Sequence, residues 1–414
     1  MRRHISLIGA AIFASGISAA QLAGVFSGTR EHPAIAYETH PLRDPVSQPN
    51  RRLHDGRAQL KFDGPSGYLR SVLDLLNIPV ESQMAVFSKT SLQATIISPQ
   101  NPRTIFFNDS VAVAWVRGEP FVEVASHDPE QGVIFYLLPQ FSPEQNGISH
   151  LLPQFPADGP PFIRRDGLCL QCHESYGSLG LPGTLLRSVF PAANGLPVRT
   201  LGDHQADHRT PYDQRWGGWF VTGKTGSLRH MGNTVFPDPA DAASYTTIDP
   251  KIDTSVYLSR YSDVVALMVF EHQMRMINLL TRLGWEVRFA AYEKKPFDLA
   301  AAAKEVVDYM LFVDEPALPG KIEGTSGFVE KFTERGPRDR RGRSLRQFDL
   351  ETRLMRYPCS YMIYTDAFDA LPVEAKTAVY QGMWQVLSVA KNRNAIVEIL
   401  RDTKKDLPEY FQVR

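Results

Sequence analysis

The sequence predicts an α+β fold, with a small antiparallel sheet region followed by a mainly helical C-terminal part. Between residues 84 and 140, short segments rich in β-branched and aromatic residues alternate with turn residues, which is typical of neighbouring strands. After residue 257, apolar residues recur at helical spacing over long segments. The chain has 414 residues, of which 43% are hydrophobic and 22% charged, so it is large enough for two or three globular domains.

The N-terminus predicts a secretory signal peptide over residues 1–20. Two arginines precede an apolar run, and the small residues Ser18, Ala19 and Ala20 follow it. The run is short for a membrane span, so we expect cleavage after Ala20 and no integral membrane span in the mature chain, although an uncleaved anchor stays open. The mature chain is therefore expected in the periplasm or otherwise outside the cytoplasm.

The next two regions lead up to the sheet. Residues 21–57 are rich in Pro, Arg, His and Asp without periodicity, which predicts an extended or poorly ordered lead-in. Residues 58–165 are expected to form an N-terminal α+β region, which begins with a short amphipathic helix in "GYLRSVLDLLNIPV". Its predicted strands are "ATIISP", "TIFFN", "VAVAWV", "FVEVAS" and "GVIFYLLPQ".

Residues 236–414 are expected to be mainly helical. A further β-like stretch, "RWGGWFVTGK", comes just before this region. The predicted helices are "YLSRYSDVVALMVFEHQMRMINLLTRLGWEVRFAAYE", "DLAAAAKEVVDYML", "VEAKTAVYQGMWQVLSVA" and "NAIVEILRDTKKDL".

The stretch "GLCLQCHESYG", residues 167–177, contains two of the three cysteines in a Cys-x-x-Cys-His motif. A zinc site would need about four ligands, and no second cysteine pair accompanies the first. A thioredoxin-like dithiol would be expected in a small βαβ unit, which the surrounding pattern does not show. An odd number of cysteines fits two thioether bonds plus Cys359, expected to be a small buried hydrophobic residue. In an exported chain the motif therefore predicts one covalently bound haem c, with a disulfide or a chance match as the alternatives.

This motif also carries a resemblance to a known family. Residues 167–235 resemble a segment of c-type cytochromes, and "DHRTPYDQRWGGWFVTGKTGSLRHMGN" resembles bacterial proteins described only as containing a cytochrome c domain. The resemblance implies thioether bonds at Cys169 and Cys172, with His173 as the axial iron ligand. It also implies that the carbonyl of Pro182 holds the other ring nitrogen of the histidine. Residues 166–235 are thus expected to be the haem c-binding region of the α+β fold.

The second axial position decides what the iron can do, because a strong second ligand is typical of an electron carrier and an open position is typical of an enzyme or gas binder. The loop Gly226–Gly232 is expected to form the distal side, with His230 as the preferred second metal ligand and Arg229 able to pair with a haem propionate. Other options for this position stay open, namely Met231, His272, His208 or no protein ligand. By their local patterns, His272 is expected to be a core residue and His208 a loop residue.

Two functions remain open. One is an exported mono-haem c-type cytochrome-like redox protein, which transfers electrons to an unidentified redox partner. The other is a haem c oxidoreductase, peroxidase-like or oxidising a small molecule, with an open or weakly ligated distal site. The sequence does not decide whether the chain is an enzyme. The 45 basic and 45 acidic residues balance, so no nucleic-acid partner is expected, and the arginine-rich run 335–346 is expected to be a solvated loop rather than a docking surface.

Overall fold

The structure is a computed structural model, and it describes residues 29–142, 162–238, 240–389 and 394–412. The expected signal peptide, residues 1–20, lies outside these ranges. Within them, no helix is both long enough and apolar enough to cross a membrane.

The core of the N-terminal half is an antiparallel sheet whose strands lie side by side in chain order. Within the described ranges it has six strands: β1 (Met84–Val86), β2 (Arg103–Phe107), β3 (Val111–Trp115), β4 (Phe121–Asp128), β5 (Gly132–Pro139) and β6 (Ile163–Arg164). Four of the five predicted segments contain strands, β2 to β5. The prediction for "ATIISP" was wrong, because its backbone is held in local turns, with the amide of Ala94 donating to Ser91 and that of Ile97 to Gln93.

The second predicted β-like stretch, "RWGGWFVTGK", is not a strand either. It makes isolated bridges at Trp219, Thr222 and Lys224, each to a different segment of the chain. Positive φ angles of 65° at Trp216 and 87° at Gly218 bend the backbone, so the start of this stretch is not extended as a strand would be. A two-stranded hairpin lies upstream instead, formed by β7 (Leu186–Val189) and β8 (Asp203–Ala206).

Residues 29–57 fold against the sheet, in contrast to the extended lead-in expected for residues 21–57. They include α2 (Ser47–His54), and Tyr37 and Val46 are fully buried. The Tyr37 hydroxyl lies 2.7 Å from the carbonyl oxygen of Val133 and shares its one proton between this oxygen and Asp166, while Asp44 accepts a hydrogen bond from Tyr136 at 2.8 Å. The buried residues that hold this segment against the sheet occur singly and at irregular spacing, so the sequence shows no periodicity here.

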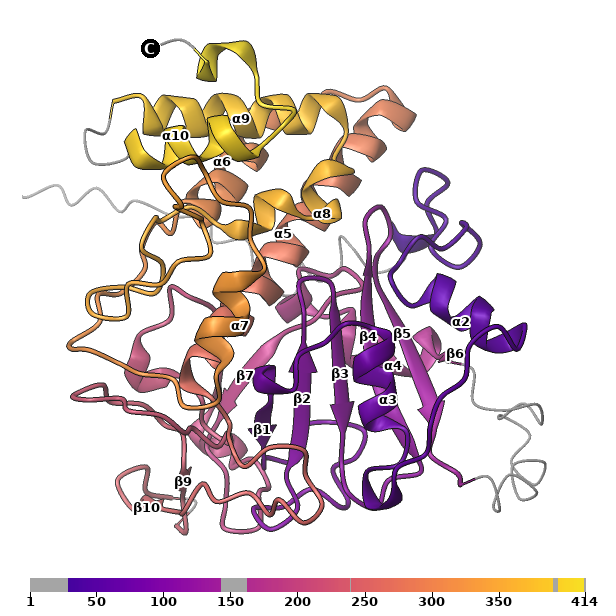
Figure 1. Ribbon diagram of the computed structural model, residues 1–414, viewed down its shortest axis with the longest axis vertical. Coiled ribbons are helices and arrows are strands. Elements are labelled where there is room, and N and C mark those ends of the chain that lie inside the picture. The colour runs from indigo at the N-terminus through magenta and orange to yellow at the C-terminus, as the bar shows by residue number, and fades with distance from the viewer. Residues whose placement is uncertain (1–28, 143–161, 239, 390–393, 413–414) are drawn as a thin grey trace, which may run out of the picture.

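The two faces of the sheet have different neighbours, since successive side chains on a strand point to opposite sides. Figure 1 shows α3 (Leu69–Leu75), the predicted amphipathic helix, lying across the near face. The other face contacts α4 (Asp166–His173) and α5 (Val264–Glu293), because the ring of Phe135 lies 4.7 Å from that of His173 and the ring of Phe107 lies 4.9 Å from that of Phe270.

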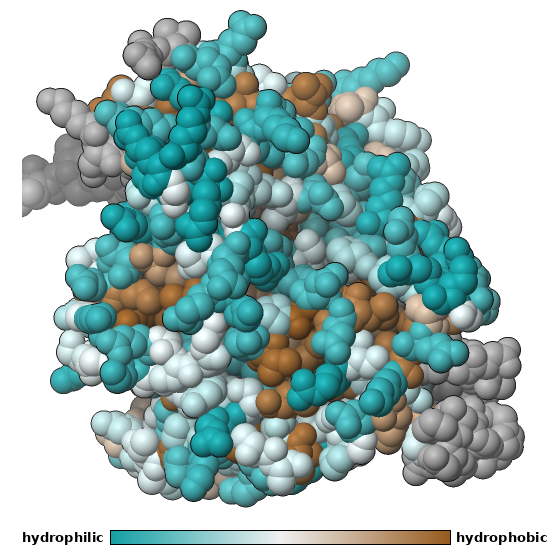
Figure 2. All heavy atoms as spheres, viewed as in Figure 1, coloured by the Kyte–Doolittle hydropathy of each residue, from teal (hydrophilic) through white to brown (hydrophobic). Residues whose placement is uncertain are grey.

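The C-terminal part contains several helices, with long irregular segments between some of them. Asp263 caps α5, accepting hydrogen bonds from the amides of Val265 and Ala266, so this helix begins several residues after the start of the predicted segment. The other helices are α6 (Leu299–Met310), α7 (Phe328–Glu334), α8 (Asp366–Asp369), α9 (Val373–Leu387) and α10 (Asn394–Thr403). Figure 1 shows α5, α6, α8, α9 and α10 gathered above the sheet. On the face seen in Figure 2, hydrophilic side chains cover most of these helices, while apolar side chains gather lower down, over the strands and α3.

Candidate cofactor site

The cysteine motif lies on the short helix α4, which packs on the sheet beside β5. Asp166 in its first turn accepts hydrogen bonds from the Tyr37 hydroxyl at 2.9 Å and the Phe135 amide at 3.2 Å, and it pairs with Arg164. Residues three and four positions apart share one face of a helix. The helix therefore presents Cys169, Cys172 and His173 on the same side.

His173 is held in one orientation and one tautomer. Its Nδ1 lies 2.9 Å from the carbonyl oxygen of Gly183, and since a carbonyl only accepts, Nδ1 carries the proton. Among the described residues no hydrogen bond reaches Nε2, whose lone pair is therefore available. Burial lowers the pKa of His173, so the ring is neutral at neutral pH.

The residue that holds His173 is Gly183 rather than the expected Pro182. The carbonyl of Pro182 accepts the amide of Val133 at 2.9 Å and ties the turn to β5 instead. The amide of Gly183 also donates to the carbonyl of His173 at 3.0 Å, so both backbone groups of Gly183 are used for the histidine. A Cβ at Gly183 would lie 2.4 Å from Oδ1 of Asn278, which explains why a glycine fits this close approach.

The two cysteines of the motif do not form a disulfide with each other. Cys172 is exposed, whereas Cys169 is half-buried against the core. Burial, together with the nearby carboxylates of Glu123 and Asp166, raises the pKa of Cys169 to about 12. A redox-active dithiol needs a thiolate with a lowered pKa, so these surroundings argue against that alternative.

A cavity of about 460 Å³ lies between α4, the sheet and the β7–β8 hairpin, and its walls include Cys169, Cys172 and His173. Its volume lies in the range of small-molecule and cofactor sites. Strand pairing places Ile105 opposite Ala114 and Ala112 opposite Ala125, so these four lie on the same sheet face. Three alanines in this floor leave the space that larger side chains would fill.

One polar pair interrupts the apolar floor of the cavity. Arg103 on β2 reaches across β3 to Glu123 on β4, and the two form an ion pair. Their charges act on the pKa of both Cys169 and His173, so the pair lies close to the motif. Neither residue was predicted from the sequence, although a charged residue within each of two apolar strands was a signal.

The rim of the cavity is unusually apolar for a surface. Leu92, Leu168 and Tyr176 line it, although their exposed fractions are 45%, 43% and 57%. Arg187 and Asp203, which pair with each other on the β7–β8 hairpin, lie at the same rim. The motif therefore opens to solvent through a mostly apolar mouth.

The expected distal loop lies outside this cavity. Neither His230 nor Met231 is among the described residues that line it, and Arg229 is exposed elsewhere. The Nδ1 of His230 accepts the amide of Gly232 at 3.0 Å, and its ring lies 5.3 Å from that of Trp216. Burial lowers the pKa of His230 to about 4. The loop length fitted a distal role, but the chain packs this loop against Trp216 instead.

Within the described ranges, no group of three or more His, Cys, Asp or Glu side chains is arranged to hold a metal ion. No protein family model matches this chain, and neither does any curated protein or solved structure. The chemistry of the site itself must therefore indicate the function.

A second set of titratable groups is buried elsewhere in the protein. His208 and His272 face each other with their Nδ1 atoms 2.8 Å apart, and Nε2 of His272 lies 2.7 Å from the Ser360 hydroxyl. His272 is a core residue as expected, and His208 lies in a turn as its local pattern predicted, although its side chain is only 2% exposed. Burial lowers the pKa of both rings, so both are neutral. Neither ring lines the cavity.

Beside the two histidines lies a fully buried ion pair. Arg215 donates to Glu271 at 3.0 Å, and the exposed fractions of their side chains are 1% and 0%. The guanidinium of Arg215 also donates to the carbonyls of Thr210 and His208 at 2.7 and 2.8 Å. Burial raises the pKa of Glu271 to about 7, and the charge of Arg215 opposes this rise. These contacts fix the loop that precedes Trp216 to α5.

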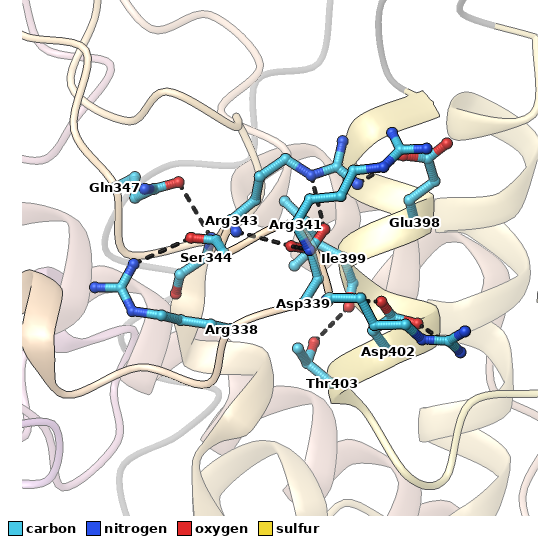
Figure 3. Close-up of polar contacts among 12 residues, drawn as sticks. Arg338, Asp339, Arg341, Arg343, Ser344, Gln347, Glu398, Ile399, Asp402 and Thr403 are labelled. Carbon is cyan, nitrogen blue, oxygen red and sulfur yellow. Dashed lines mark hydrogen bonds and ion pairs between the residues drawn. The ribbon is translucent and has the colours of Figure 1, made fainter.

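The arginine-rich run 335–346 is largely paired within the protein. Figure 3 shows Asp339 at its centre, where the side chain accepts from the amides of Arg341 and Arg343 at 2.9 and 2.7 Å. Arg343 and Arg341 also contact Glu398 of α10, at 2.6 and 2.9 Å. The prediction of a solvated loop was therefore only partly correct, because an acidic residue on a helix distant in sequence pairs with two of these arginines.

Proposed function

We propose that the chain is an exported redox protein that binds one haem c covalently through Cys169 and Cys172, with His173 as the axial iron ligand. Haem c supplies an iron centre that changes oxidation state and binds small ligands. The observation that carries the proposal is the fixed tautomer of His173, because its hydrogen bond to Gly183 leaves a neutral Nε2 in the cavity wall. Such an outer hydrogen bond is typical of metal-bound histidines.

The surroundings of the motif support the same proposal. The two thiols and the imidazole share one face of α4, next to a cavity of about 460 Å³. The alanines of β3 and β4 leave space above the sheet in the floor of the cavity. An export signal over residues 1–20 would deliver the chain to the periplasm, where haem c is attached.

The second axial position favours a ligand-binding or catalytic haem over a dedicated electron carrier. Among the described residues that line the cavity, His173 is the one histidine and there is no methionine. These two residue types are the usual strong protein ligands of c-type haem iron. We therefore favour a haem c oxidoreductase, peroxidase-like or acting on a small molecule, in which the second position is open to exogenous ligands.

Electron transfer remains the second candidate because of one observation. Cys172 is exposed, and Leu168 and Tyr176 beside it form part of the apolar rim. A cofactor bound to Cys172 would thus have an edge near the surface, where an unidentified redox partner could exchange electrons with it.

Optical spectra with and without carbon monoxide separate the two candidates. The protein would be produced in a host that matures c-type cytochromes, reduced, and exposed to carbon monoxide. We expect a high-spin ferrous spectrum that changes fully on carbon monoxide binding, because the described residues that line the cavity include no second histidine and no methionine.

The matched control is His230→Ala, which removes the ligand suggested by the sequence. This variant is expected to bind carbon monoxide as the wild-type protein does. A low-spin ferrous wild-type protein that does not bind carbon monoxide, together with a His230→Ala variant that does, would contradict the open position and restore His230 as a ligand.

A further inference from the structure

Arg103 is a half-buried cation with unused hydrogen-bonding capacity. Its side chain is 20% exposed and donates to Glu123, while its Nε is buried without any hydrogen-bond partner. A guanidinium has five N–H donors, and leaving a buried donor unpaired is unfavourable. Because the Arg103 side chain is 20% exposed and lines the cavity, the exposed part of its guanidinium can donate to an oxygen acceptor inside the cavity.

The charges around the cavity indicate which kind of acceptor fits. Two arginines are among the described lining residues, Arg103 in the floor and Arg187 at the rim. The Arg187 side chain is 43% exposed and its charge is therefore screened by solvent, whereas that of Arg103 acts in a less polar environment. Arginine is especially suited to carboxylates, because its fork matches their two oxygens.

We propose that Arg103 binds a carboxylate of the cofactor inside the cavity and raises the reduction potential of the iron. The inference rests on the proposed haem binding, because haem carries two propionate carboxylates. It replaces the role that the sequence suggested for Arg229, which lies outside the cavity. Glu123 positions the guanidinium and partly offsets its charge.

The sign of the effect follows from electrostatics. A positive charge near the iron favours the reduced state, which carries one positive charge less, and so raises the reduction potential. Removing the charge of Arg103 should lower the potential. Removing the opposing charge of Glu123 should raise it.

The test is redox titration of full-length, haem-loaded protein carrying single substitutions. Arg103→Gln is expected to lower the reduction potential, Arg103→Lys to retain most of the wild-type value, and Glu123→Gln to raise it. Arg229→Gln is the matched control and should leave the potential unchanged. If Arg103→Gln does not fold, the opposite shift of Glu123→Gln still tests the charge pair.

Three results would overturn the inference while leaving the haem proposal intact. The first is a haem-loaded Arg103→Gln variant with the wild-type potential, and the second is a shift caused by Arg229→Gln instead. The third is weaker azide binding by Arg103→Gln without any shift in reduction potential, which would show that the guanidinium binds added anions instead of a carboxylate of the cofactor. Absence of haem from the wild-type protein would instead overturn the proposed function itself.

Discussion

Replacing His173 with alanine is expected to remove the protein ligand of the iron while the thioether bonds remain. In the proposed site, the hydrogen bond from Nδ1 to the carbonyl of Gly183 fixes the orientation of the imidazole beside the cysteines. The haem that remains attached to the His173→Ala variant should therefore have a strongly altered absorption spectrum. Added imidazole should restore much of the wild-type spectrum, because it can occupy the position that the side chain leaves.

The control for this variant is His230→Ala, which should keep the wild-type spectrum, since His230 packs against Trp216 outside the cavity. An unchanged spectrum for His173→Ala would show that another residue ligates the iron. Such a result would remove the main support for the proposed site.

Replacing Arg215 with alanine is expected to destabilise the fold by about 3–5 kcal/mol, because it leaves the buried carboxylate of Glu271 unpaired. The exposed pair of Arg187 and Asp203 gives the comparison, and Arg187→Ala should cost about 0–1 kcal/mol. Urea denaturation of the haem-loaded variants would measure both losses. Adding Glu271→Gln to Arg215→Ala should recover part of the stability, since it removes the unpaired charge.

The loss caused by Arg215→Ala should also depend on pH. Burial raises the pKa of Glu271 in the folded state, so the folded protein binds this proton more tightly than the unfolded chain does. Without Arg215 the stability should therefore fall as the pH rises above the unfolded pKa of the carboxyl group. A loss equal to that of Arg187→Ala, or one that is larger in acid, would contradict this account of the pair.

Features set by neighbouring residues could be predicted from the sequence. Apolar alternation indicated strands β2 to β5, and helical periodicity indicated α5, α6, α9 and α10. The Cys-x-x-Cys-His motif is also local, because one helical turn is enough to bring its three side chains to one face.

Features set by tertiary packing could not be predicted in this way. Arg103 and Glu123 form an ion pair because β2 and β4 lie on either side of β3 in the sheet. His208 lies in a loop and contacts His272, which is 64 residues further along the chain. The conformation of the turn determines whether the carbonyl of Pro182 or that of Gly183 accepts the hydrogen bond from His173. Loop length alone favoured His230, but it carries no information about which surface the loop packs on.

Covalent haem attachment can be measured by intact-mass spectrometry after acid–acetone extraction. The wild-type protein, matured in a cytochrome c assembly host, is predicted to retain the mass of one haem. The Cys169→Ala, Cys172→Ala double variant from the same host should have the mass of the polypeptide alone. A wild-type protein that also has only the polypeptide mass would contradict the account.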